Sequence, residues 1–173
     1  MTSRFALHLS AHQVRVVYLA VGYHLARPGS EIDPDTLQEY EHGLRELPPV
    51  LGPLLEREEA TLSLTPFQLL RLDTALLSII NELKSYPLLD MVAGESGRPR
   101  SLAPGFDDLL KRLFPRVAEE PDYAVELAQD ALHLHRQLRP HLERARELVA
   151  QEREEATRSR QRPRWQFWRK GGP

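Results

Sequence analysis

The residues with the most distinctive chemistry lie at the end of the chain, where basic and aromatic side chains are mixed. Both tryptophans of the protein are in this segment, with one phenylalanine between them. Tryptophan favours the zone between a membrane and water, and arginine is attracted to anionic headgroups by about 1 kcal/mol per charge near the surface. The segment therefore predicts a site for an anionic surface, formed by Arg158, Arg160, Arg162, Arg164, Trp165, Phe167, Trp168, Arg169 and Lys170.

Three other interpretations fit the same segment. Arginine and tryptophan are frequent hot-spot residues of interfaces, so the segment also suits an acidic partner protein. Arginine contacts to phosphate and tryptophan stacking on bases would suit nucleic acid. In the last interpretation, the three aromatic side chains fold back and cover an apolar groove of the same domain.

The charge of the chain is divided unevenly between this segment and the rest. The formal net charge is −2, but residues 156–173 carry six basic side chains and no acidic one. The first 155 residues carry 17 basic and 25 acidic side chains, which is a formal charge of −8. An acidic body argues against nucleic acid, because dedicated nucleic-acid-binding proteins usually carry positive charge on their folded surface as well.

Two carboxylate–histidine pairs are the candidates for metal binding. Glu39 and His42 are three residues apart, and so are Asp130 and His133, which places each pair one turn apart on a helix. Helical di-metal proteins combine such pairs with two further carboxylates that point inward from other helices. The sequence offers few inward carboxylates, so we expect these histidines to lie on exposed helix surfaces.

Signatures of familiar catalytic sites are absent from the sequence. The chain has no cysteine, which excludes disulfides, thiolate zinc sites and cysteine nucleophiles. It also lacks a phosphate-binding loop, a glycine-flanked nucleophilic serine and a His-Glu-x-x-His pattern. In the most apolar predicted helix, only Asp73 and Glu82 are candidates for inward carboxylates. We therefore expect a protein without a cofactor.

The element that leads into the tail is a helix predicted from Asp122 to about Thr157. Pro140 falls inside it, so we expect a kink or two helices end to end at that point. Its apolar residues recur at steps of three and four, as in a helix packed along one stripe. The stripe comprises Ala124, Leu127, Ala131, Leu134, Leu138, His141, Ala145 and Leu148. We favour coverage of this stripe by the rest of the chain; the alternative is a coiled coil in a homodimer.

Two similar stretches, residues 7–13 and 62–68, predict the same local structure. Each has two leucines flanking one residue, then a hydroxyl side chain, then a glutamine three residues later. This pattern predicts a short extended segment and a helix that begins with a capping box. We expect the two extended segments to pair as a ribbon. Because the similarity ends after the glutamine, a true duplication of residues 4–58 and 59–113 stays open.

Helix-breaking residues divide the remainder of the chain. After Ser10, the first helix is expected to run to Ala26 and to stop at Arg27-Pro28-Gly29. The apolar helix after Thr65 is expected to be the central buried one, ended by Pro87. Three shorter helices are also predicted. The first covers residues 34–47 and ends before Pro48-Pro49, the second begins at Pro53, and the third covers residues 106–118.

These elements predict a predominantly all-α fold. It is a helical bundle of about five or six helices with a long C-terminal helix and at most a short two-stranded β element. Residues 1–157 are predicted to form the helical domain, and residues 158–173 a flexible basic-aromatic tail. No apolar run is long enough to cross a bilayer, and the N-terminal residues lack a signal-peptide pattern. We expect a cytoplasmic protein, with peripheral attachment at the inner membrane face.

The sequence favours a non-catalytic interaction or adaptor protein. Its acidic helical body would bind protein, and its tail would attach it to an anionic membrane surface or an acidic partner. One alternative is a small helical metal-binding protein or enzyme that uses the carboxylate-x-x-His pairs. Another is a nucleic-acid accessory protein that binds through the tail.

Overall fold

The computed structural model describes residues 4–27, 43–96, 103 and 105–161. Within these ranges the chain forms five α-helices, three 3₁₀ turns and one antiparallel ribbon of two strands. This confirms the predicted helical bundle with a long C-terminal helix. In chain order the elements are β1 (Phe5–Ser10), α1 (Ala11–Ala26), η1 (Leu44–Glu46), α3 (Leu47–Leu51), η2 (Gly52–Leu54), β2 (Glu59–Leu64), α4 (Pro66–Ser96), α5 (Phe106–Leu113), η3 (Pro115–Ala118) and α6 (Tyr123–Gln161).

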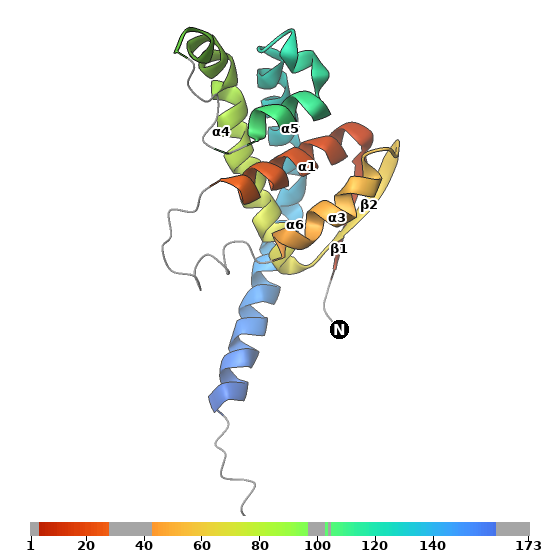
Figure 1. Ribbon diagram of the computed structural model, residues 1–173. Helices are drawn as coiled ribbons and strands as arrows, with labels where there is room; N and C mark the ends of the chain where they lie inside the picture. Colours follow the sequence, from red (N-terminus) through yellow and green to blue (C-terminus); the bar gives the residue numbers. More distant parts are fainter. Residues whose placement is uncertain (1–3, 28–42, 97–102, 104, 162–173) are drawn as a thin grey trace, which may run out of the picture.

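The core forms where α4 and α6 pack against each other, the most extensive interface among the described elements. Helix α1 lies across both of them, and the ribbon with α3 covers one side (Figure 1). The fully buried side chains of α4 recur at steps of three and four, which is the spacing of one helix face. They include Leu69, Leu72, Leu76, Ile79 and Leu83.

The β-ribbon and both capping boxes are present as predicted. Leu7 pairs with Leu62 in the antiparallel register, and both leucines are buried because alternate residues of each strand face the core. At the start of α1, Gln13 N donates to Ser10 Oγ and Ser10 N donates to Gln13 Oε1. At the start of α4, residues Thr65 and Gln68 exchange the equivalent two hydrogen bonds.

The prolines of the N-terminal half do not act as predicted. Pro48 and Pro49 are the second and third residues of α3, in the first turn, where the N–H groups that they lack would have no partner within the helix. They therefore lie at the beginning of a helix and do not end one. Pro87 was expected to end α4 but lies inside it, and the helix continues to Ser96. Buried Leu83 and Tyr86 hold the preceding turn against the core, which offsets the single hydrogen bond that the proline removes.

The remaining short helices differ from the prediction in kind and position. The end of the helix expected at 34–47 is a 3₁₀ turn after Gly43, whose φ of 76° favours glycine. The rest of that predicted helix lies outside the described residues. The helix expected from Pro53 is the 3₁₀ turn η2, and the helix expected at 106–118 is α5 followed by η3.

Helix α6 is one continuous helix, so of the two alternatives predicted at Pro140, a kink or two helices end to end, the second is wrong. Pro140 lies on the exposed side, where its ring meets solvent and not the core. The predicted stripe is buried as far as Leu138. Beyond it the buried positions are Leu142, Ala145 and Val149, whereas His141 is exposed. The stripe therefore follows 3.6 residues per turn, and the chain's own helices cover it, as favoured from the sequence.

Candidate functional site

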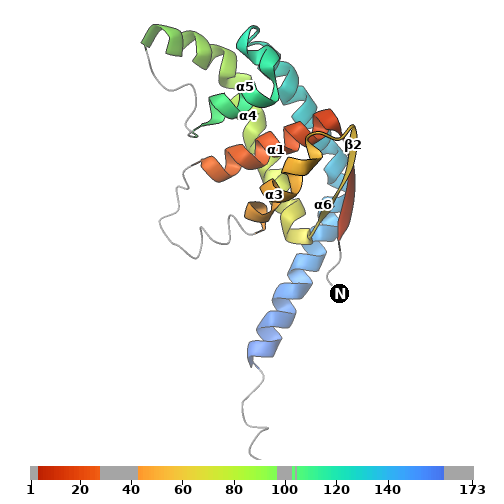
Figure 2. The same ribbon diagram turned by 45° about the vertical axis from the view of Figure 1, so that its right-hand side comes forward.

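The last three turns of α6 extend beyond the rest of the described fold. Figures 1 and 2 show this end of the helix alone, without a neighbouring element on either view. Val149 is the last residue that the structure describes as buried, and beyond it residues 150–155, 157 and 158 are all exposed. At 1.5 Å per residue, the twelve residues from 150 to 161 form an arm of about 18 Å.

This arm carries the start of the predicted basic tail. Arg158 is exposed on α6 and forms an ion pair of 3.4 Å with Glu154. Position 160 also belongs to α6, so the helix includes residues 158–161, which the sequence had assigned to the tail. The other predicted binding residues lie outside the described residues. They are Arg162, Arg164, Trp165, Phe167, Trp168, Arg169 and Lys170.

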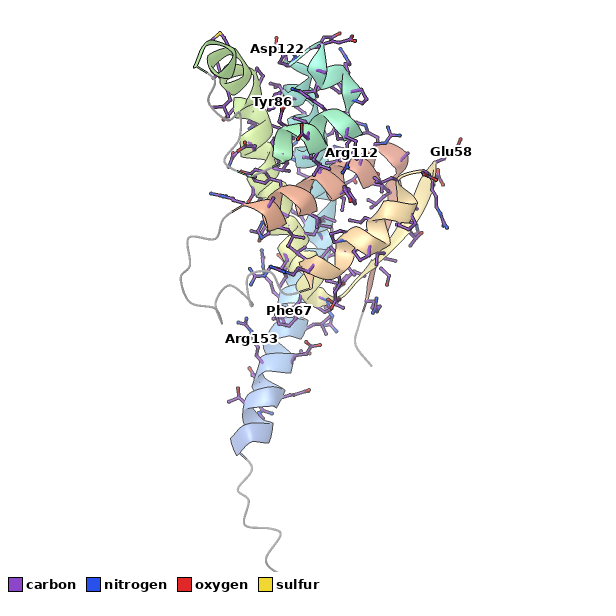
Figure 3. The ribbon with its side chains drawn as sticks, in the orientation of Figure 1. Glu58, Phe67, Tyr86, Arg112, Asp122 and Arg153 are labelled. Carbon is purple, nitrogen blue, oxygen red and sulfur yellow. The ribbon has the colours of Figure 1, made fainter. Side chains whose placement is uncertain are left out.

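A groove lies at the base of the arm, between the first turns of α4 and the end of the buried part of α6. Its volume is about 400 Å³. We call it the arginine groove, and its lining residues are Phe67, Leu70, Arg71 and Thr74 from α4 and Arg146, Val149, Ala150 and Arg153 from α6. Figure 3 shows Phe67 and Arg153 at this junction. The Arg153 guanidinium carbon is 5.9 Å from the centre of the Phe67 ring, within the range of a cation–π interaction.

The electrostatics of the groove follow from the helical phase of α6. Arg146 and Arg153 are seven residues apart, so they share the face of Val149. Glutamates of the same stretch lie on other faces: Glu147 pairs with Arg144 at 3.0 Å, and Glu154 pairs with Arg158. None of the described residues that line the groove is acidic. The groove thus combines an apolar floor with three arginines at its rim.

The opposite end of α6 is acidic. Glu119, Glu120, Asp122 and Glu126 are all exposed there, and Figure 3 shows Asp122 at the far end of the fold from Arg153. Carboxylates near a helix N-terminus interact favourably with its dipole. The hydrogen bond to Glu120 raises the pKa of the Arg116 guanidinium above its ordinary value.

Each inward carboxylate of α4 lies against a polar side chain of another helix. Asp73 Oδ1 lies 2.7 Å from His135 Nδ1 of α6, and both side chains are largely buried. Glu82 Oε2 accepts a hydrogen bond of 2.9 Å from the Tyr23 hydroxyl of α1. Each carboxylate therefore joins α4 to a different helix, and they do not converge on a common site.

The candidate metal ligands do not converge either. Asp130 Oδ2 is 2.8 Å from His12 Nε2, a partner that sequence reasoning missed. His133 Nε2 is 3.0 Å from the side-chain nitrogen of Gln137. Among the residues that the structure describes, no three histidine, aspartate or glutamate side chains lie close enough to hold a metal ion. Glu39 and His42 lie outside the described residues.

A larger hollow of about 590 Å³ lies between the ribbon and η2. Its lining mixes opposite charges, Arg57 and Glu59, and includes His8, whose Nδ1 is 3.1 Å from Thr61 Oγ1. Mixed charge at an open surface selects no ligand class, so the arginine groove is the stronger candidate site.

Comparison of the chain with protein-family models, with curated proteins and with solved structures finds no match. None of the helices within residues 4–27, 43–96 and 105–161 is long and apolar enough to cross a membrane.

Proposed function

We propose that this protein is a non-catalytic helical adaptor. Its basic, tryptophan-containing C-terminal segment attaches to an anionic membrane surface, and its acidic helical body binds a protein partner. The observation that carries this proposal is the exposed arm of α6, on which the basic segment begins at Arg158, about 13 Å beyond buried Val149.

The arm suits this role for an electrostatic reason. Residues 1–155 carry a formal charge of −8, so an anionic surface repels the body while it attracts the tail. Screening reduces the interaction between exposed charges beyond about 10 Å at 0.1 M salt. An arm longer than this distance lets the tail bind without bringing the acidic body against the membrane. An acidic partner protein would be bound by the same chemistry, and the experiment below separates the two.

Vesicle flotation tests the proposal. The full chain is compared with a chain ending at Gln161, which keeps α6 and removes only residues 162–173. We expect the full chain alone to float, only with anionic vesicles, and to be released as salt rises, because residues 162–173 carry four of the six cations and both tryptophans. A Trp165→Ala/Trp168→Ala variant should float less while keeping the charge.

Two results would contradict membrane attachment. If the full chain does not float with anionic vesicles, the tail has another target, and an acidic partner becomes the favoured one. If the chain ending at Gln161 floats equally well, attachment resides in the body and the tail is not the anchor.

A further inference from the structure

Residues 28–42 connect two points of the fold that both lie beside the arginine groove. Arg27, at the end of α1, lines a surface hollow together with Thr74, and Thr74 lines the arginine groove as well. At the other end, Gly43 packs against Gln68 in the first turn of α4. Its carbonyl oxygen is 3.3 Å from Gln68 Nε2, and a Cβ atom at this glycine would lie 2.8 Å from Gln68 Cγ. The connecting segment therefore begins and ends next to the groove.

The length of the segment suits this path. Gln68 and Thr74 are six residues apart, which is about 9 Å along α4. The predicted helix before Gly43 would cover about 14 Å, and residues 28–33 can extend to about 20 Å. Gly43 has a left-handed backbone with a φ of 76°, which is common for the residue that follows a helix. A helix that ends at this glycine can lie along the groove while the preceding residues return to α1.

The side chains of the segment complement those of the groove. The segment has five acidic side chains and no lysine or arginine, which suits the three arginines of the rim. The acidic residues are Glu31, Asp33, Asp35, Glu39 and Glu41. Leu37 and Tyr40 are three residues apart, so within a helix they share one face and can cover the apolar floor.

The other charged segments outside the described residues have the wrong sign for this groove. Residues 97–102 carry two arginines and no acidic side chain, and residues 162–173 are basic as well. Phe67, Arg71 and Arg153 already have interaction partners in the folded chain, so the groove is not a surface that only another protein can cover. Because the acidic segment is held at both ends, its effective concentration at the groove is high.

We infer that residues 28–42 occupy the arginine groove of the same chain, with Leu37 and Tyr40 on its floor and acidic side chains paired with the arginines of its rim. The pairing neutralises the cations of the groove, which is thereby removed as a second site for an anionic surface or an acidic partner. The inference goes beyond the proposed function and does not rest on it, because it concerns a contact within one chain.

Disulfide crosslinking in the full chain tests this contact, because the protein has no cysteine of its own. Ala150→Cys lies at the exposed edge of the groove, and it is combined, one at a time, with Thr36→Cys, Gln38→Cys or Glu41→Cys. A disulfide forms where the two Cα atoms come within about 7 Å. The matched control uses Glu152→Cys in place of Ala150→Cys, because two further residues turn the side chain to the opposite side of α6.

We expect at least one pair with Ala150→Cys to crosslink within one chain under mild oxidation. The pairs with Glu152→Cys should crosslink at least about tenfold more slowly, because the tether does not bring the segment to that side of the helix. Non-reducing gel electrophoresis measures both rates, since a disulfide between the segment and α6 closes a large loop and changes the mobility of the denatured chain.

Charge reversal in the pair that crosslinks tests the role of the arginines. Arg146→Glu/Arg153→Glu reverses the rim and should slow crosslinking at least about fivefold, because the acidic segment is then repelled. The control is Arg139→Glu/Arg144→Glu, the same change of charge on exposed positions of α6 outside the groove. It should change the rate less than about twofold.

Three outcomes would overturn the inference. In the first, no pair with Ala150→Cys crosslinks faster than its control with Glu152→Cys. In the second, reversal of the rim slows crosslinking no more than the control reversal does. In the third, crosslinked dimers form in place of crosslinked monomers, which assigns the groove to the segment of a second chain. The assay contains no vesicles, so failure of flotation does not affect this inference, and failure of crosslinking does not affect the proposed function.

Discussion

Gln13 and Gln68 occupy equivalent positions in two capping boxes, yet the structure predicts unequal effects when each is replaced by alanine. Gln13 is at the exposed start of α1. Its Oε1 accepts from Ser10 N at 3.0 Å, and its Nε2 donates to Gln137 Oε1 at 3.3 Å. Water can replace both hydrogen bonds, so Gln13→Ala is expected to cost about 0.5–1 kcal/mol of unfolding free energy.

Gln68 is buried and holds together the start of α4 and the turn η1. Its Oε1 accepts from Thr65 N at 2.9 Å, and its Nε2 donates to Gly43 O at 3.3 Å and to Glu46 Oε2 at 3.2 Å. A net hydrogen bond contributes about 1 kcal/mol, and one to a charged group about 1.5–3 kcal/mol. Because solvent reaches this site poorly, Gln68→Ala is expected to cost about 3 kcal/mol.

Thermal unfolding followed by circular dichroism at 222 nm measures both variants, because most of the described residues are helical. In a chain of this size, 1 kcal/mol shifts Tm by about 2–4 °C. Gln68→Ala should therefore lower Tm by about 6–12 °C, and Gln13→Ala by about 1–4 °C. Equal shifts would refute the argument from burial.

Gln68→Met is the control that separates packing from hydrogen bonding. Methionine keeps most of the volume of the glutamine side chain and loses all of its polar partners. We expect a Tm close to that of Gln68→Ala. A Tm close to wild type would show that volume, and not hydrogen bonding, stabilises this corner.

Two further predictions concern α6. Pro140→Ala should raise stability by about 1–3 kcal/mol, because it restores an N–H for the carbonyl of Arg136 at an exposed position; an unchanged or lower Tm would contradict this. Asp73→Ala should cost about 1–3 kcal/mol because it leaves the buried His135 ring without its nearest polar neighbour, whereas Asp73→Leu/His135→Leu should recover most of that loss. Urea unfolding measures both, and a double variant less stable than the single one would oppose this reasoning.

The parts of the fold that depend on a few neighbouring residues were predictable from the sequence. The two capping boxes, the ribbon and the end of α1 near Arg27 each follow from side chains within one or two turns. Pro48, Pro49 and Pro87 were misread because a proline is compatible with the beginning, the interior or the end of a helix. Which of these occurs depends on packing that only the folded chain provides.

The arginine groove could not be predicted in the same way, because its two walls come from residues 67–74 and 146–153. The sequence did contain a partial signal: Arg146 and Arg153 are separated by seven residues and share the helix face that carries the buried stripe. The predicted stripe, however, was a heptad repeat extrapolated from Ala124, which reaches His141 and Leu148. Because a heptad drifts relative to a straight α-helix, these positions lie on a face that is rotated away from both arginines.

The continuity of α6 has a consequence for orientation. Each residue of a helix turns the chain by about 100° and advances it by 1.5 Å, so the arm sets the azimuth at which the tail leaves the body as well as its distance. Position 160 lies seven residues beyond Arg153, so it has nearly the same rotational phase as the groove. Removal of seven residues from the arm would shorten it by about 10 Å with little change of phase. Removal of two would turn the end of the helix toward the opposite side of the body, so the length of this helix sets the direction in which the chain continues beyond Gln161.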